Sequence, residues 1–338
     1  FSLEDKMNYI GSKHSLLDFL HDTISEVTGF KEGDEFTFAD LFAGTGAVGT
    51  SYRKKGCNVI SNDIQYYSYV LNRHYIENSL SPDNELLEYM NTLKGIKGFI
   101  YNNYCSGSGS GRNYFTDSNG MRCDAMRSEL ERLYREKKID SSVYFHFLAS
   151  IINSIDKYAN TASVYGAFLK HTKKSAERNF RLELLPVING KKGKAYNENI
   201  STLIKKISGD VLYLDPPYNA RQYSANYHVL ETIAKYDNPV LHGKTGLRDY
   251  TNQKSEFCSS KTAENVFRNL IADADFKYIF LSYNNEGIMP LEAIKKIMSE
   301  FGEYQCYTKQ YRRFKADKNE NRNIKSDSTV EYLHCLIK

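Results

Sequence analysis

An acid, two prolines and a tyrosine, Asp215-Pro-Pro-Tyr218, form the segment of the sequence best suited to chemistry. The residues before it, Val211-Leu-Tyr-Leu214, have the β-branched and aromatic bias of a buried strand. Because proline can continue neither a paired strand nor a helix, the chain must turn stiffly there. Open α/β sheets bind ligands at the carboxyl ends of their strands. The turn therefore predicts a site that uses the Asp215 carboxylate and the Tyr218 ring.

A glycine loop, Gly44-Thr-Gly-Ala-Val-Gly49, is the second candidate for ligand binding. With Asp63 nineteen residues after Gly44, it has the outline of a dinucleotide fingerprint, in which the acid binds a ribose hydroxyl. Asp40 argues against a dinucleotide, because a carboxylate beside the glycine turn would repel a pyrophosphate. S-adenosylmethionine has no phosphate, and its ammonium and sulfonium attract an acid. The loop therefore favours S-adenosylmethionine over NAD.

Three segments together resemble the amino-group DNA methyltransferases, specifically the Dam-like adenine-N6 enzymes of the alpha arrangement, including type II modification methylases. They are Tyr9-Ile-Gly-Ser-Lys13, Asp40-Leu-Phe-Ala-Gly-Thr-Gly46 and Asp215-Pro-Pro-Tyr218, with a long insertion before the last. This order is the alpha order, so the resemblance spans essentially the whole chain. It implies a site-specific DNA methyltransferase that moves a methyl group from S-adenosylmethionine to the N6 amine of a flipped adenine in double-stranded DNA. It also implies a restriction-modification system, with a cognate restriction endonuclease that acts on the same site.

The reaction gives each residue of the proline turn a role. The exocyclic amine of adenine is a poor nucleophile, because its lone pair is delocalised into the ring. Acceptors on its two hydrogens would aim that lone pair at the methyl group, and the Asp215 carboxylate and the Pro216 carbonyl are the natural pair. Pro216 and Pro217 fix the direction of the carbonyl, and Tyr218 offers an aromatic face to a flipped base. We predict these four residues as catalytic.

The resemblance also implies which residues hold the cofactor. Tyr9 and Lys13 would flank its methionine part, with Lys13 near the carboxylate, and Asp63 would bind the ribose. The family usually has an aspartate before the last catalytic strand that accepts from the adenine amine of the cofactor. Asn199 stands there in this chain, and its amide oxygen can accept the same bond. The complete predicted set is Tyr9, Lys13, Asp40, Phe42, Gly44, Gly46, Asp63, Ile64 and Asn199.

Two kinds of residue predict where DNA binds. Residues 170–194 contain eight Lys or Arg against two Glu, which suits contacts with phosphates. Polar and aromatic residues in 112–115 and 160–170 are typical of segments that read bases, and residues after Tyr218 should lie at the mouth of the base pocket. The predicted DNA-binding residues are Arg112, Tyr165, Lys170, Lys173, Lys174, Arg178, Asn219, Arg221, Arg248 and Arg312.

Other functions remain as alternatives. Methyltransferases of an RNA base amine or of a protein glutamine amide also use an acid or asparagine before two prolines and an aromatic. They usually lack the N-terminal lysine motif and an insertion of this length, so an RNA methyltransferase is the second choice. A non-catalytic nucleic-acid binder is disfavoured by the intact proline turn, and an NAD oxidoreductase is disfavoured by Asp40.

The surrounding pattern predicts an α/β fold, a Rossmann-like methyltransferase sheet with an inserted, mostly helical DNA target-recognition domain. The catalytic domain would comprise residues 1–80 and 195–338, and the insertion residues 81–194. Predicted strands are 35–40, 58–63, 210–215, 276–283, 303–314 and 329–337. Predicted helices are 12–27, 82–97, 124–138, 142–158, 226–236 and 289–301.

Composition excludes several classes of protein. The net charge is +4, hydrophobic residues make up 41% of the chain, and no apolar run is long enough to cross a membrane. The N-terminal residues lack the basic start and apolar stretch of a signal peptide, so a cytoplasmic protein is expected. The six cysteines form no C-x-x-C pair, which favours reduced thiols and no metal site.

Overall fold

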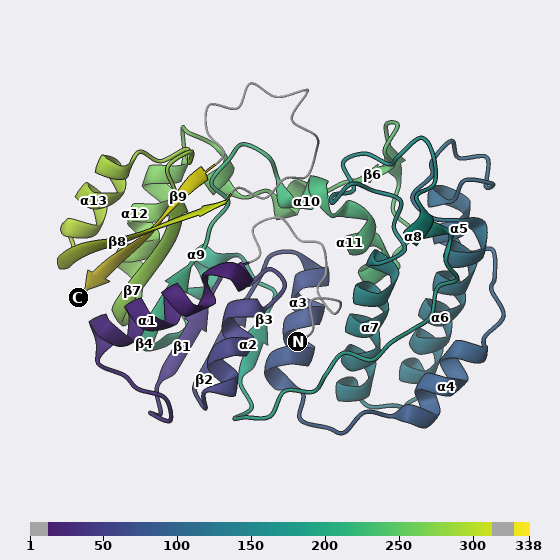
Figure 1. The fold of residues 1–338 in the computed structure, drawn as a ribbon, viewed down its shortest axis with the longest axis horizontal. Helices are drawn as coiled ribbons and strands as arrows, with labels where there is room; N and C mark the ends of the chain where they lie inside the picture. The colour runs from purple at the N-terminus through teal and green to yellow at the C-terminus, as the bar shows by residue number, and fades with distance from the viewer. Residues whose placement is uncertain (1–12, 313–327) are drawn as a thin grey trace.

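The computed structural model describes residues 13–312 and 328–338, and its centre is a seven-stranded sheet (Figure 1). The strands lie in the order β3-β2-β1-β4-β7-β9-β8. Their bounds are β1 Thr37–Asp40, β2 Asn58–Asn62, β3 Lys194–Tyr196, β4 Ser208–Leu214, β7 Asp275–Asn284, β8 Glu303–Arg312 and β9 Ser328–Ile337. From β3 to β7 the strands are parallel, whereas β9 is antiparallel to both of its neighbours. The predicted Rossmann-like α/β fold class is confirmed.

The chain leaves the middle of the sheet in two directions. It proceeds outward from β1 through β2 to β3 on one side, and from β4 to β7 on the other. The order therefore reverses between β1 and β4, and such a switch point is where open α/β sheets form a ligand crevice. Asp40 ends β1 and Asp215 directly follows β4, so both predicted acids lie at this point.

Helices cover both faces of the sheet. One hydrophobic cluster contains α1 (Leu17–Thr28), α2 (Ala47–Lys54) and α3 (Tyr66–Asn72), and the other contains α9 (Ile200–Leu203), α12 (Ala263–Asp273) and α13 (Leu291–Ser299). Along β4, Val211 and Tyr213 belong to the first cluster, and Leu212 and Leu214 to the second. This strand is buried on both faces, which explains its uninterrupted apolar run.

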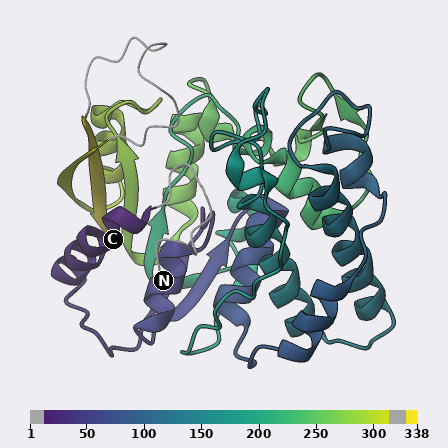
Figure 2. The same ribbon diagram turned by 45° about the vertical axis from the view of Figure 1, so that its right-hand side comes forward.

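The segment between β2 and β3 is largely helical and lies to one side of the sheet in both views (Figure 1, Figure 2). After α3 and a π-helical turn, η3 (Arg73–Glu77), come α4 (Asn84–Thr92), α5 (Phe99–Tyr104), α6 (Asp117–Arg135), α7 (Ser141–Asp156) and α8 (Lys174–Glu177). The side chains of Asp83, Thr116 and Asp140 accept backbone hydrogen bonds at the N-termini of α4, α6 and α7. Because Thr116 caps α6, the helix begins at Asp117 and not at residue 124 as predicted.

The helical segment and the sheet share one hydrophobic cluster. Helix α7 packs on α3 and on α11 (His228–Lys235), which follows the short α10 (Tyr223–Asn226). The hairpin of β5 (Leu241–His242) and β6 (Leu247–Arg248) also joins this side, because the Tyr104 hydroxyl donates to the Gly246 carbonyl (3.0 Å). The domain boundaries 1–80, 81–194 and 195–338 stay predictions, with residues 223–248 placed against the helical segment.

Several elements were not predicted from the sequence. They are the helices α3, α5, α8, α9, α10 and α12, the short strands β3, β5 and β6, and the 3₁₀ turns η2 (Lys13–Leu16), η4 (Thr251–Gln253) and η5 (Glu256–Cys258). The predicted helix 12–27 is divided into η2 and α1. Within the described ranges, no helix has the length and apolar character needed to cross a membrane.

Candidate active site

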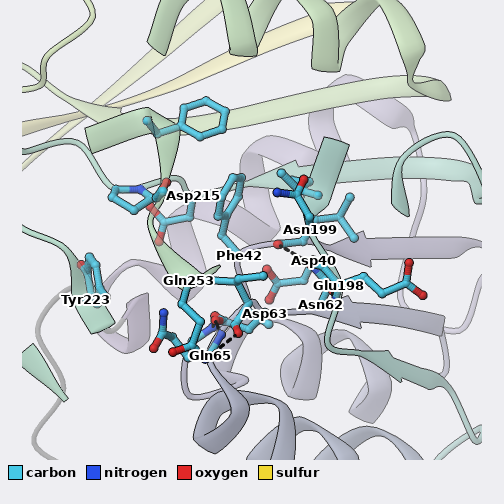
Figure 3. A pocket seen from close by; sticks show the side chains of 18 of the residues that line it. Asp40, Phe42, Asn62, Asp63, Gln65, Glu198, Asn199, Asp215, Tyr223 and Gln253 are labelled. Carbon is cyan, nitrogen blue, oxygen red and sulfur yellow. Dashed lines mark hydrogen bonds between the residues drawn. The ribbon is translucent and has the colours of Figure 1, made fainter. Parts of the chain in front are cut away.

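A cavity of about 1090 Å³, open in part to solvent, lies at the switch point between β1 and β4 (Figure 3). The loop after β1, the turn after β2, the residues before α9 and the turn after β4 all line it. The predicted residues among its lining are Lys13, Asp40, Phe42, Gly44, Asp63, Ile64, Asn199, Asp215 and Pro217. Gly46, Pro216 and Tyr218 are next to lining residues, and Tyr9 lies outside the described residues. The structure therefore brings together the two motifs that are far apart in the sequence.

Asp215 forms an ion pair that the sequence did not predict. Its Oδ1 lies 3.2 Å from Nζ of Lys13, and the same ammonium lies 2.8 Å from Oε1 of Glu331 in β9. Burial, with a contribution from the charge of Glu331, raises the pKa of Asp215 to about 6 against the lowering effect of Lys13. Lys13 was predicted to approach the cofactor carboxylate, and in this structure its ammonium holds the predicted catalytic acid.

The prolines and Tyr218 form the wall of the turn that carries Asp215. Pro216 is buried and Pro217 is half-buried. The Tyr218 ring packs edge to face on Tyr283, with centroids 6.5 Å apart, and the Tyr218 carbonyl accepts the backbone N–H of Ile288 (2.9 Å). The ring is half-buried, and burial raises the pKa of its hydroxyl. The turn is thus fixed on both sides before any ligand binds.

Asp40 is a buried acid with one unpartnered oxygen. Its Oδ2 accepts the backbone N–H of Gly49 (3.2 Å), whereas Oδ1 has no partner among the described residues. Burial, together with the nearby charge of Asp215, raises the pKa of Asp40 to about 8. A buried carboxylate at a cavity wall fits a cationic ligand group, and the methionine ammonium and the sulfonium of S-adenosylmethionine are such groups.

The glycine loop is held by Asn72 of α3, a residue that sequence reasoning missed. Asn72 Nδ2 donates to the Gly44 carbonyl (3.1 Å) and to the Ser68 carbonyl (2.9 Å). Gly46 has φ +80°, and a Cβ atom there would lie 2.9 Å from Oδ1 of Asn72. A side chain at this position is therefore excluded both by the backbone conformation and by the approach of α3.

Asp63 connects the glycine loop to the turn after β2. Its Oδ2 accepts the Gly44 N–H (2.9 Å) and its Oδ1 accepts the Gln65 N–H (2.8 Å). Burial raises the pKa of Asp63 to about 6, although these backbone bonds oppose the rise. Each oxygen keeps a lone pair, which suits a ribose diol. Ile64 follows directly and lines the same wall.

Asn199 has a structural task besides its predicted one. Its side-chain oxygen caps α9 by accepting the Ser201 N–H (2.9 Å), and the residue is exposed. The neighbouring Glu198 also lines the cavity, and Asn62 fixes it by accepting its backbone N–H (3.0 Å). The prediction that Asn199 accepts from the adenine of the cofactor remains, with only part of that oxygen available.

The segment 253–257 closes the cavity and was not recognised from the sequence. Gln253 Nε2 donates to the Ile64 carbonyl (3.2 Å) and to Oε1 of Glu231 in α11 (2.6 Å). Phe257 packs edge to face on Phe42 of the glycine loop, with centroids 5.3 Å apart. Figure 3 shows Gln253 beside Gln65 and Asp63. No glycine pattern or paired acid marks this segment, so only the fold reveals its place.

Two predicted DNA-binding residues are buried, and the structure contradicts a direct DNA contact for both. Tyr165 has 0% exposure, and its hydroxyl donates to Asp156 (2.6 Å). Arg248 is 6% exposed, and its guanidinium makes two hydrogen bonds to the Asp237 carboxylate (3.0 and 2.7 Å). The Tyr165 hydroxyl and both terminal nitrogens of Arg248 have partners within the fold, which local sequence cannot reveal.

Arg112 and Lys173 also make contacts within the protein. The guanidinium of Arg112 donates to the carbonyls of Asn103, Gly243 and Lys244, which joins α5 to the β5–β6 hairpin. The Lys173 ammonium donates to the Thr161 carbonyl (2.8 Å), and the side chain is half-buried. Both residues therefore stabilise the helical segment between β2 and β3, which forms the helical side of the molecule. A phosphate contact by either residue stays a prediction.

The remaining predicted DNA-binding residues are exposed where the structure describes them. Lys170, Lys174 and Arg178 lie on the surface of the helical side, and Asn219 and Arg221 lie on the turn after Tyr218. Arg312 is the last described residue of β8, and its side chain lies outside the described part of the chain.

Comparison with known proteins gives one family. Residues 9–297 match the family model of the D12 class N6 adenine-specific DNA methyltransferase. The chain is 52% identical to the type II methyltransferase M.NlaIII of Neisseria lactamica, over 98% of this chain and 99% of that relative. It is 40% identical to the type II methyltransferase M.FokI of Planomicrobium okeanokoites, over 92% of this chain and 50% of that longer relative. It is 33% identical to the type II methyltransferase M.CviAII of Paramecium bursaria Chlorella virus 1, over 92% and 94% of the two chains.

Proposed function

The chain belongs to the D12 class of N6 adenine-specific DNA methyltransferases, and from that premise we propose that it methylates one short sequence in double-stranded DNA as a type II modification enzyme. The observation that carries the proposal is the position of Asp215, in a proline-fixed turn at the wall of the cavity, which is also lined by Asp40 at the end of β1 and Asp63 directly after β2. We assign it to the Dam-like alpha arrangement, because the glycine loop precedes the helical segment and the proline turn follows it.

S-adenosylmethionine is the methyl donor, and when bound it supplies an electrophilic methyl group on a sulfonium. In our proposal Asp40 faces the cationic methionine part with its unpartnered Oδ1, and Asp63 binds the ribose diol. Phe42, Ile64 and the segment 253–257 would exclude water from the nucleoside. A dinucleotide would place its phosphates beside the glycine loop and would need positive polarisation there. Asp40 instead places a carboxylate at that position.

Asp215 and the Pro216 carbonyl would accept hydrogen bonds from the two amine hydrogens of the target adenine. The nitrogen lone pair would then be directed at the methyl group, which would pass from sulfur to nitrogen, and the amine would afterwards lose a proton to solvent. Asp215 would stabilise the positive charge that develops on the nitrogen. Tyr218 would stack on the flipped base, since a base in a duplex is otherwise out of reach.

The helical side, residues 81–194, would serve as the DNA target-recognition domain. Its exposed basic residues Lys170, Lys174 and Arg178 would contact phosphates, which position the enzyme without specifying sequence. Asn219 and Arg221 would act at the mouth of the base pocket. A cognate restriction endonuclease that cleaves the same unmethylated sequence is the proposed partner.

Sequencing of methylated sites tests this function. Genomic DNA without methylation is incubated with the protein and S-adenosylmethionine, and modified positions are mapped across the genome. We expect N6-methyladenine in one short recurring sequence, with equal amounts of duplex RNA left unmodified. Methylation spread over unrelated sequences, or confined to RNA, would contradict the proposal.

A further inference from the structure

We propose that Glu331 in β9 is a positioning residue that acts through Lys13 and keeps the Asp215 carboxylate available to the target amine. The inference rests on the proposed role of Asp215. It extends that role to a residue beyond the span 9–297 that matches the family model.

Glu331 and Asp215 share the ammonium of Lys13. Nζ of Lys13 lies 2.8 Å from Oε1 of Glu331 and 3.2 Å from Oδ1 of Asp215. Glu331 is 1% exposed and Lys13 is 7% exposed, so water does not screen the pair. The shorter distance belongs to Glu331, which therefore holds the ammonium more closely than the catalytic acid does.

Strand pairing and a hydrogen bond from β7 fix the position of the Glu331 carboxylate. Ser282 of β7 donates a 2.5 Å hydrogen bond to the same Oε1 that binds Lys13. The residue before Ser282, Leu281, pairs with Leu214, the residue before Asp215. Ser282 and Asp215 thus lie side by side on neighbouring strands, and Glu331 reaches their level from β9.

Because Lys13 is shared with Glu331, the Asp215 carboxylate can offer more of its charge to the target amine. An ammonium bound to Asp215 alone would occupy one oxygen and neutralise the charge that must accept from the amine and stabilise its cation. The charge of Glu331 balances Lys13, so the ammonium offsets less of the charge of the ionised Asp215 carboxylate while it still fixes the orientation of that carboxylate. Glu331 thus sets how strongly Lys13 competes with the adenine for Asp215.

Several titratable groups surround Asp215. Among the described residues they are Lys13 of η2, Asp40 of β1, Tyr213 of β4, Tyr218 and Tyr223 after β4, and Glu331 of β9. Of the charged members, Lys13 and Asp40 line the cavity with Asp215, whereas Glu331 does not. Its charge can therefore be removed without changing the surface that meets the cofactor or the base.

The test is the pH dependence of single-turnover methylation at saturating S-adenosylmethionine and DNA. Glu331→Gln keeps the shape and the hydrogen-bond acceptor but removes the charge, which leaves the ammonium to Asp215. Loss of a like charge and closer pairing with Lys13 both stabilise the ionised carboxylate, so the pKa of Asp215 falls. We expect the pH at which the rate is half-maximal, on the acid side of the profile, to fall by about one unit. Glu303→Gln, which removes an exposed charge from β8, is the matched control and should keep the wild-type midpoint.

A ¹³C NMR titration of the Asp215 carboxyl in cofactor-free protein measures the same pKa without catalysis, with Asp215→Asn used to assign the signal. Glu331→Asp serves if Glu331→Gln does not fold. Its shorter side chain keeps the charge but withdraws it from Lys13, so a smaller shift in the same direction is expected.

The outcomes separate the inference from the proposed function. Unchanged midpoints in both the rate and the NMR titration of the Glu331 variant overturn the inference, even if the maximal rate falls, because a structural defect lowers the rate equally at every pH. The proposed role of Asp215 fails separately, if Asp215→Asn methylates DNA at the wild-type rate.

Discussion

Asp40 is buried at the end of β1, Asp215 is partly buried directly after the neighbouring β4, and the two carboxyls have different charges around them. Asp215 has the Lys13 ammonium beside it, whereas Asp40 accepts the Gly49 N–H and has the like charges of Asp215 and Asp63 nearby. Burial raises the pKa of Asp40 to about 8 and that of Asp215 to about 6. A cation bound at Asp40 would lower its pKa, so cofactor binding and proton release from Asp40 are coupled.

Asp40→Asn tests that coupling. The folded-state pKa of Asp40 is raised to about 8, so its contribution to stability is present at acidic pH and is lost as the pH rises through about 8. The unfolding temperature of the neutral variant, relative to that of wild type, should therefore be higher at pH 9 than at pH 5. Cofactor affinity of wild type should improve as the pH rises to about 8, while that of Asp40→Asn should be weaker and independent of pH over that range. Calorimetric titrations with S-adenosylmethionine that show the same pH slope for both proteins would refute the assignment.

Asp215 and Asp63 should separate catalysis from cofactor binding. Asp215→Ala should abolish methyl transfer with cofactor affinity nearly intact, because only the acceptor for the amine is lost. Asp63→Ala should weaken cofactor binding by about 1–3 kcal/mol, the value of hydrogen bonds to a charged group. Equilibrium dialysis with labelled S-adenosylmethionine and an assay of DNA methylation measure the two effects. A parallel loss of binding and activity in Asp215→Ala would assign Asp215 to the cofactor instead.

At the scale of the elements, the site depends on where α3 meets the glycine loop. Gly46, which precedes α2, has φ +80° and faces Asn72 of α3, whereas Gly29, after α1, has φ +76° and nothing within 4 Å of a Cβ atom. The two glycines have the same backbone conformation in different surroundings.

Gly46→Ala and Gly29→Ala form a matched pair. Each should lower the free energy of unfolding by about 1–2 kcal/mol, because a side chain strains the left-handed backbone. Only Gly46→Ala should also displace Asn72 and the loop, and we expect its cofactor affinity to fall more than that of Gly29→Ala. Denaturant unfolding and calorimetry measure both quantities. Equal cofactor affinity in the two variants would show that the approach of α3 does not shape the loop.

Local sequence predicted the elements that carry their own signal. Strands β1, β2, β4 and β7 were found because they are apolar runs, and Asp40, Asp63 and Asp215 were found because each ends or follows one of them. Lys13 and Asp215 were predicted separately, but the second ion pair of Lys13, with Glu331, depends on β9 lying beside β7, which is set by sheet order. The segment 253–257 was missed for the same reason, and Tyr165 and Arg248 were misassigned because their burial depends on distant partners.

At the scale of the whole molecule, α5, α6 and α8 lie at the opposite end from α12 and α13 (Figure 1). Lys170, Lys174 and Arg178 are exposed on the helical side. Lys261, Lys295 and Lys296 are exposed near or on the helices of the opposite part of the sheet, and so provide a control of equal charge.

Replacing Lys170, Lys174 and Arg178 with Gln should weaken DNA binding equally for target and random duplexes. Each lost phosphate contact should make the slope of log K against log salt shallower by about 0.9. Replacing the three control lysines should leave the slope unchanged. Fluorescence anisotropy over a range of salt concentrations measures it. A loss confined to the target duplex would instead make the basic residues readers of bases.

The methylated product tests the central claim most directly. Duplex DNA containing the mapped site is incubated for one turnover with S-adenosylmethionine carrying a ¹³C methyl group, and its nucleosides are analysed by mass spectrometry. We expect the label on N6 of adenine with wild-type protein and no labelled nucleoside with Asp215→Ala, although both proteins bind the cofactor. Label on cytosine, or undiminished labelling of adenine by Asp215→Ala, would contradict the account.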